Sequence, residues 1–200
     1  MSILPAAYLP SIRYFAALQR GDCVIDLGEH FVKRSERNRA RIMTSHGVMD
    51  LSAQVAHANR LHQPMHAVRL DYSKRWQHQH WGALVANYKA APFFDHYAER
   101  LAPFYEQPWE RLADFNLALL EVLCAAAHLP MPTISTSYIT AAPDDLDLRQ
   151  KEKGSAFYTE PYMQVFADRQ PFVPNLSFVD LLFAEGPAAC AVLKNCRFEG

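Results

Sequence analysis

Hydrophobic residues alternate between strand-like runs and helical spacing over the first thirty positions. Residues 3–4 form a short apolar run that ends at a proline, and residues 23–27 form a compact apolar run typical of a buried parallel strand. Between these runs, apolar residues recur near helical spacing over residues 12–20, and Ser11 can cap the first helical turn. The pattern predicts a β-α-β unit at the start of the chain.

A different pattern follows, in which apolar and polar residues alternate over residues 49–55. Alternation is typical of a half-buried strand, and the turn residues at 45–47 predict a hairpin whose first strand covers 40–44. Successive residues of a strand point to opposite faces. One face would carry Arg39, Arg41 and Met43, and the other would carry Ala40 and Ile42.

The middle of the chain returns to helical spacing. Three helices are predicted, the first from Trp76 until Pro92, the second near 94–105 and the third near 109–129. Shorter patterns predict strands at 67–71, 133–139 and 162–166, a helix from 178 that stops at 186–187, a loop at 57–65, and a charged mobile loop at 143–155.

These elements predict an α/β fold. The N-terminal β-α-β unit and the hairpin would form a mixed, mainly parallel sheet, which the helical middle region would cover. A chain of 200 residues that is 50% hydrophobic fits one domain over 1–200. The α/β part would span about 1–72 and 133–200, and the helical part about 73–130.

Charge and cysteine content narrow the classes of function. The formal net charge is −1, so nucleic acid is not expected as a partner, because general nucleic-acid binders are usually more basic. The four cysteines form no Cys-x-x-Cys pair and are interpreted as reduced thiols. The N-terminus lacks the pattern of a signal peptide, and no apolar run is long enough to span a membrane. A cytoplasmic protein is therefore predicted.

Local charge is concentrated in residues 33–41, which hold five of the twenty Lys and Arg residues. This stretch follows the second predicted strand, and α/β folds bind ligands beyond the carboxyl ends of parallel strands. We therefore predict an anionic small-molecule substrate, because Arg offers a bidentate fork and Lys a mobile charge. The candidate substrate-binding residues are Lys33, Ser35, Arg37, Asn38 and Arg39, and Arg41 belongs to the same run. The alternative is a solvated surface paired with Glu29 and Glu36.

Acid or base chemistry would need a group such as His30, Asp26 or Tyr8, the candidate catalytic residues. His30 has an ordinary pKa near neutrality (about 6.5) and could equally be hydrogen-bonded at a strand end. Asp26 stands at the end of the second strand and could equally be a turn or capping aspartate.

Two further polar residues are candidates for substrate binding. His80 falls on an apolar helix face and could equally be a core histidine. Asp180, inside a helix, needs a buried partner, and an Arg of residues 33–41 is the candidate. The remaining histidines lack the spacing of a metal motif, so no metal is predicted. Glycine-rich phosphate loops are absent, and no cofactor can be assigned.

Several motifs, in order and spacing, resemble one known family across nearly the whole chain. They are Tyr8-Leu9-Pro10, Tyr14-Phe15, Lys33-x-Ser35-x-Arg37-Asn38-Arg39, Asp71-Tyr72-Ser73-x-x-Trp76-Gln77, His80, Pro92-Phe93-Phe94, Tyr162-x-Gln164-Val165-Phe166, Phe172-Val173-Pro174-x-Leu176-Ser177 and Asp180-Leu181-Leu182-Phe183-x-x-Gly186-Pro187. Together they resemble the WbqC-like family, which is named for a protein of O-antigen and surface-polysaccharide gene clusters. The resemblance implies a pathway more than a reaction.

The chain departs from the family pattern at two places. Many members begin with Gln-Pro-x-Tyr-x-Pro, which is similar to the start of nucleotidyltransferase-type folds, whereas this chain has Pro5-Ala6-Ala7-Tyr8 there. The charged loop at 143–155 stands where longer members carry a block resembling Tyr-Leu-Ser-Gly. Both departures weaken the case for nucleotide transfer.

The leading hypothesis is an enzyme of bacterial surface-polysaccharide biosynthesis that binds an anionic small molecule, with or without an activating nucleotide. The alternative is a non-catalytic binding or assembly protein that uses the same basic edge. A deep pocket at Lys33, Arg37 and Asn38 would favour the enzyme, and a flat surface with exposed tryptophans would favour the alternative.

Overall fold

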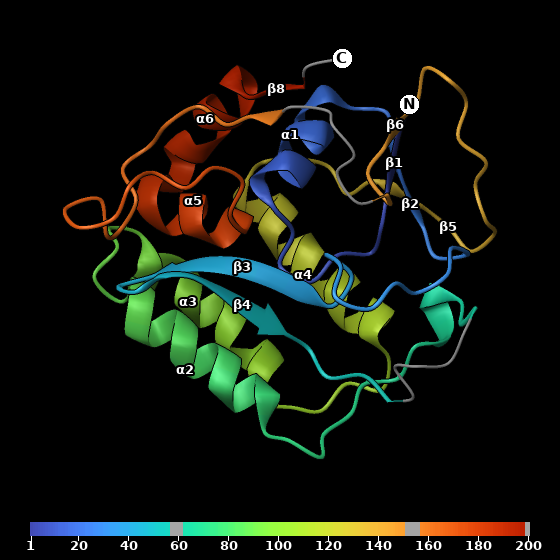
Figure 1. Cartoon of the computed structure of the whole chain (residues 1–200), viewed down its shortest axis with the longest axis horizontal. Helices are drawn as coiled ribbons and strands as arrows, with labels where there is room; N and C mark the ends of the chain where they lie inside the picture. Colours follow the sequence, from blue (N-terminus) through green and yellow to red (C-terminus); the bar gives the residue numbers. More distant parts are fainter. Residues whose placement is uncertain (57–61, 151–156, 199–200) are drawn as a thin grey trace.

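The computed structural model describes residues 1–56, 62–150 and 157–198, and its strands and helices are shown in Figure 1. The strands are β1 (Ser2–Leu4), β2 (Cys23–Asp26), β3 (Arg39–Thr44), β4 (Gly47–Ser52), β5 (Thr133–Ser135), β6 (Leu146–Asp147), β7 (Phe157–Tyr158) and β8 (Arg197–Phe198). The helices are α1 (Ile12–Arg20), α2 (Trp76–Tyr88), α3 (Phe94–Leu101), α4 (Leu112–Ala126), α5 (Phe178–Glu185) and α6 (Ala189–Asn195).

The predicted β-α-β unit is confirmed as β1, α1 and β2. Ser11 caps α1, and its hydroxyl accepts a hydrogen bond from the amide of Tyr14 at 3.4 Å. β1 and β2 pair in parallel with Ile3 opposite Val24, inside a four-stranded sheet whose order is β5-β2-β1-β6 and whose pairings are all parallel. The α/β fold class is therefore confirmed.

Strand β6 corrects the prediction of a mobile loop at 143–155. The amides of Leu146 and Leu148 donate to the carbonyls of Met1 and Ile3, at 3.0 and 2.9 Å. The open backbone edge of β1 thus organises a segment whose own residues have little strand propensity, and no local pattern reveals it. Residues 151–155 of the predicted loop lie outside the described residues.

The hairpin is confirmed as β3 and β4, but it forms a sheet of its own and does not join a mixed sheet. Part of the outer edge of β3 is occupied, because the carbonyl of Arg41 accepts a hydrogen bond from the amide of Ser177 at 2.8 Å. Ala40 and Ile42 are buried as predicted. Met43 is buried as well, since this end of β3 is covered on both faces.

The helical middle region is confirmed with different bounds. The second predicted helix is divided into α3 and a 3₁₀ turn over Ala102–Tyr105, and the third is shortened to α4. Figure 1 shows α2 and α3 beside the hairpin, whereas α5 and α6 lie on the side of α1. The late helix ends at Gly186 as predicted, where φ is 52°.

Two short strand predictions are wrong. Residues 162–166 form no strand, and the side chains of Tyr162 and Gln164 bond to Asp180. Residues 67–71 form only isolated bridges, Leu70 with Val55 and Arg69 with Arg111. Of the loop predicted at 57–65, residues 57–61 lie outside the described residues.

Two glycines provide a matched test of packing. A Cβ atom on Gly28 would overlap the backbone nitrogen of Tyr138 and lie 2.9 Å from the carbonyl oxygen of Thr136, whereas a Cβ on Gly82 in α2 would meet nothing within 4 Å. Gly28→Ala should lower the free energy of unfolding by about 1–3 kcal/mol through overpacking. Gly82→Ala should raise it by about 0.5–1 kcal/mol, because alanine favours the helix. Urea denaturation measures both, and a shift of the same sign would contradict the packing.

Candidate functional site

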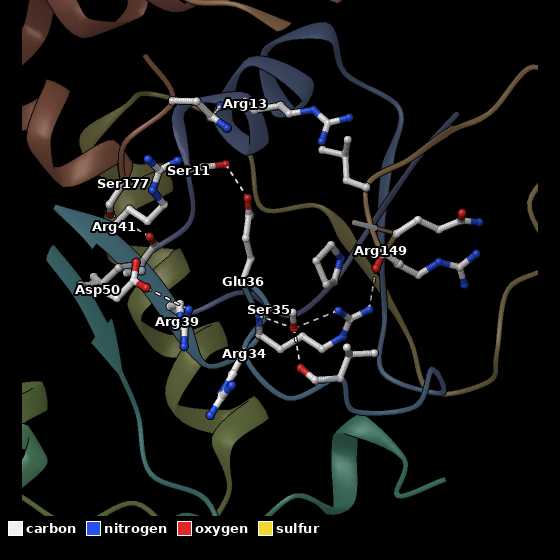
Figure 2. A pocket seen from close by; sticks show the side chains of 18 residues that line it. Ser11, Arg13, Arg34, Ser35, Glu36, Arg39, Arg41, Asp50, Arg149 and Ser177 are labelled. Carbon is white, nitrogen blue, oxygen red and sulfur yellow. Dashed lines mark hydrogen bonds and ion pairs between the residues drawn. The ribbon is translucent and has the colours of Figure 1, made fainter. Parts of the chain in front are cut away.

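A cavity of about 630 Å³ opens beside the hairpin (Figure 2). Its wall includes Pro5, which follows β1, and residues 148–150, which follow β6. It also takes residues from the cationic stretch, the start of α1 and the segment before α5. Among the described residues, six arginines line it: Arg13, Arg34, Arg37, Arg39, Arg41 and Arg149.

The position of the cavity follows from the order of the strands. The chain proceeds from β1 outward to β2 and β5, and then returns to place β6 on the opposite side of β1. The strand order therefore reverses between β1 and β6, and open α/β sheets bind ligands in the crevice outside the carboxyl ends of strands at such a switch point. The cavity lies at the carboxyl ends of these two strands.

Arg37 is the most deeply buried arginine of the cationic stretch, with 3% of its surface exposed. Its Nε donates to the Glu29 carboxylate at 2.9 Å, and its Nη2 donates to the other oxygen of that carboxylate. Further donors reach the hydroxyl of Ser35 at 3.1 Å and the carbonyl of Arg149 at 3.0 Å. Burial raises the pKa of Glu29 to about 7, and the opposing effect of Arg37 favours the ionised form. Arg37 thus shapes the cavity wall from behind.

Arg149 forms the second buried ion pair, with Asp26 at the end of β2 and with Asp147 at the end of β6. The hydrogen bond to Asp147 raises the pKa of Arg149. Figure 2 shows the guanidinium of Arg149 directed away from the cavity, while its carbonyl faces Arg37. Sequence reasoning missed this residue because it lies in the segment interpreted as a loop. The one signal in the sequence is that Asp147 stands two residues before Arg149, next to the apolar residues Leu146 and Leu148.

Asp26 is fully buried and acts as a structural acceptor. One oxygen accepts the amides of Gly28 and Glu29, and the other accepts the amide of Ile139 and the guanidinium of Arg149. Four donors occupy the acceptor positions of a carboxylate. These contacts correspond to the alternative interpretation of Asp26 as a turn aspartate.

Ser35 and Asn38 hold the cationic stretch in its path. The Ser35 hydroxyl donates to the carbonyl of Val32 at 2.6 Å, and the Asn38 amide group bonds to the backbone of Arg34 and Ala53 at 3.2 Å each. Ser35 lines the cavity and Asn38 lies behind it. Both residues therefore fix the geometry of the neighbouring arginines.

Three arginines that line the cavity, Arg34, Arg39 and Arg41, are more exposed than the buried Arg37 and Arg149. Arg39 pairs with Asp50 across the hairpin at 2.8 Å, on the surface. The side chains of Arg34 and Arg41 are exposed, and neither makes a hydrogen bond or ion pair with another residue in the described part of the chain. Lys33 is also exposed but does not line the cavity. Arg34, Arg39 and Arg41 are thus the cations best placed to meet a ligand.

The three predicted catalytic residues are not brought together. The exposed His30 lies beside His62, with the two Nδ1 atoms 3.4 Å apart. The Tyr8 hydroxyl is buried and lies 2.9 Å from Nδ1 of His80 and 3.1 Å from the hydroxyl of Tyr105. Burial raises the pKa of Tyr8 well above its ordinary value of 10, so this hydroxyl is a poor acid at neutral pH. None of Tyr8, Asp26 and His30 lines the cavity.

The two remaining candidates, His80 and Asp180, are also buried away from the cavity. Burial lowers the pKa of His80 to about 4, so it is neutral at pH 7. Asp180 has the buried partners that were predicted, but they are not arginines: the hydroxyls of Tyr88 and Tyr162 donate to it at 2.6 and 2.5 Å. Burial raises the pKa of Asp180, and the two hydroxyl donors oppose that effect.

Backbone strain is concentrated at the cavity. Among the described residues, six other than glycine have a positive φ, and three of these, Leu9, Arg34 and Asn175, line the cavity. Asparagine tolerates the left-handed region, but leucine and arginine lose about 1–2 kcal/mol there. The carbonyl of Leu9 is held by the Ser177 hydroxyl at 2.7 Å. Strained residues tend to gather at functional sites, which favours this cavity as one.

The backbone amides in the first turn of α1 are not available to bind an anion, although the helix dipole there favours one. The amides of Ile12, Arg13 and Tyr14 already donate to Leu176, Asn175 and Ser11, respectively. An anion would therefore be bound by side chains. Within the described ranges, no three His, Cys, Asp or Glu side chains lie close enough to hold a metal ion. The absence of a metal stays a prediction.

These features define an α/β protein with an arginine-lined cavity at the switch point of a parallel sheet. The chain belongs to the WbqC-like protein family, whose sequence model matches residues 6–159. It is 28% identical over 232 aligned positions to the uncharacterized protein Rv1507c of Mycobacterium tuberculosis, with 98% of each chain covered. No solved structure matches the chain.

In the part of the chain that the structure describes, no helix has the length and apolar character needed to cross a membrane.

The burial of Arg37 predicts a large effect on stability. Arg37→Ala would leave the Glu29 carboxylate buried without its cation, so the free energy of unfolding should fall by about 3–5 kcal/mol. Arg39→Ala, which breaks the exposed pair with Asp50, should cost at most about 1 kcal/mol. Urea denaturation at pH 8, where Glu29 is largely ionised, compares the two variants. Equal losses would show that Arg37 does not form a buried pair.

The low pKa of His80 predicts a pH dependence of stability. The unfolded chain takes up a proton near pH 6.5 and the folded protein only near pH 4, so protonation favours unfolding as the pH falls. Between pH 8 and pH 4.5 this residue should remove about 2.5 kcal/mol of stability. His80→Asn keeps an acceptor for Tyr8 but has no such titration. The difference in unfolding free energy between the two proteins should narrow as the pH falls, and a constant difference would contradict this account.

Proposed function

We propose that this protein is a cytoplasmic enzyme of bacterial surface-polysaccharide biosynthesis, of the O-antigen type, that binds an anionic small molecule in the arginine-lined cavity. The observation that carries the proposal is the coincidence of six arginines with the switch point between β1 and β6. A volume of about 630 Å³ is within the usual range for small-molecule sites. The pathway rests on the family, because WbqC is named from an O-antigen biosynthesis locus.

The proposed roles divide the cationic stretch into two groups. Arg34, Arg39 and Arg41 contact the anionic group of the ligand, since their side chains are at least partly exposed at the cavity. Arg37 and Asn38 maintain the shape of the wall through buried contacts. No catalytic step is assigned to Tyr8 or Asp26, because both are buried outside the cavity.

The alternative, a non-catalytic assembly protein, would require an aromatic surface for a partner. Trp76 is only 1% exposed, and Trp81 and Trp109 are partly buried against the core. Trp81 stacks on Phe94 and Tyr105. The tryptophans thus serve the interior, which supports the cavity as the functional surface.

A thermal-shift screen tests the proposal. Nucleotides, nucleotide-sugars, sugar phosphates and acyl donors are compared, and a true ligand at about 100 times its Kd should stabilise the protein by about 2.7 kcal/mol. Arg41→Ala should weaken this stabilisation, because it removes a guanidinium proposed to contact the ligand. The Arg41 side chain makes no hydrogen bond or ion pair with the described residues, so its loss should leave the fold intact. Arg100→Ala removes an exposed arginine of α3 outside the cavity and is the matched control.

Two results would count against the proposal. One is the absence of stabilisation by every anionic compound in the screen. The other is a ligand whose stabilising effect is equal in the wild type, Arg41→Ala and Arg100→Ala, because such a ligand would bind elsewhere.

A further inference from the structure

In the described part of the chain, two carboxylates line the same cavity as the arginines. Glu36 lies between Arg39 and Arg149 in Figure 2, and Asp50 lies on the hairpin. The Glu36 carboxylate accepts a hydrogen bond from the Ser11 hydroxyl at 3.0 Å. The backbone carbonyl of Glu36 accepts one from the amide of Tyr8 at 2.8 Å. Glu36 is therefore held in place at both its backbone and its side chain.

A carboxylate in this position is unfavourable for a bare anion. Two like charges 4 Å apart near a protein surface repel by about 4 kcal/mol. A carboxylate accepts hydrogen bonds and donates none, so it fits a ligand that also carries hydroxyl groups. Neutral polar side chains of the lining can bond to hydroxyls as well; among the described residues these are Ser11, Ser35, Gln150, Asn175 and Ser177.

The residues that line the cavity also indicate whether its ligand contains a nucleobase. None of the described residues that line the cavity carries an aromatic ring. Proteins commonly hold bases by stacking them on aromatic side chains, at about 1–3 kcal/mol for each base. The cavity thus combines cations, carboxylates and hydroxyls but has no aromatic surface for a base.

We propose that the ligand of this cavity is a sugar phosphate without a nucleobase, whose phosphate meets Arg41 and whose hydroxyls donate to Glu36. Glu36 is then the residue that distinguishes a phosphorylated sugar from phosphate alone. This inference rests on the proposed function, because it assumes that the cavity is the binding site.

Isothermal titration calorimetry tests the assignment with four hexose 1-phosphates (glucose, galactose, mannose and N-acetylglucosamine), inorganic phosphate, glucose and UDP. At least one hexose phosphate should bind the wild type more tightly than inorganic phosphate, glucose or UDP do. Glu36→Gln should weaken its binding about tenfold, since a bond to a charged acceptor is stronger than one to an amide. The same variant should bind inorganic phosphate as well as or better than the wild type. Glu121→Gln, on the exposed face of α4, is the control and should change neither.

The outcomes separate this inference from the proposed function. If phosphate compounds bind and Arg41→Ala weakens them, but Glu36→Gln has no selective effect or UDP binds most tightly, the sugar phosphate assignment is wrong and the anion site stands. If Glu36→Gln weakens inorganic phosphate and hexose phosphate equally, its effect is structural and the assignment is also wrong. If no phosphate compound binds but another anionic compound of the thermal-shift screen does, the sugar phosphate assignment is wrong and the anion site stands. If no anionic compound binds, or Arg41→Ala changes the binding of none, both proposals fail.

Discussion

The buried pairing of two arginines with acidic residues, Arg37 with Glu29 and Arg149 with Asp26, fixes the geometry on which the cavity depends. A buried pair gains little over apolar packing, but removing one partner leaves an uncompensated charge. The pair of Arg149 with Asp26 joins segments that are distant in sequence, and the Arg149 carbonyl accepts a bond from Arg37. The segment after β2 and the segment after β6 are therefore held as one wall.

This arrangement divides a uniform run of cations into two kinds of residue. Arg37 is enclosed with its carboxylate, whereas Arg41 is exposed at the cavity, although only four positions separate them. The difference follows from the backbone: strand β3 begins at Arg39 and turns alternate residues outward, while Arg37 precedes it and is directed toward the sheet. Charge density in a sequence indicates where cations gather, but pairing decides which of them can meet a ligand.

The sequence predicted the elements that local periodicity defines and missed those that distant contacts create. The Ser11 cap, the hairpin and α2 were predictable because each depends on neighbouring residues. β6 was not, since its two residues pair with an edge that only β1 supplies. The same reason hid Arg149, and it led Asp26 to be considered as a catalyst when its four donors come from three separate segments.

The balance of charge explains how the cavity can be both arginine-rich and selective. Among the described residues, five carboxylates line the cavity or pair with its arginines, namely Glu36, Asp50, Glu29, Asp26 and Asp147. This pairing weakens the long-range field of the arginines, and exposed charges are further screened by salt. Recognition must therefore come from short-range geometry, in which donors from arginine and acceptors from Glu36 stand at fixed places. A ligand that satisfies both is favoured over one that merely carries negative charge.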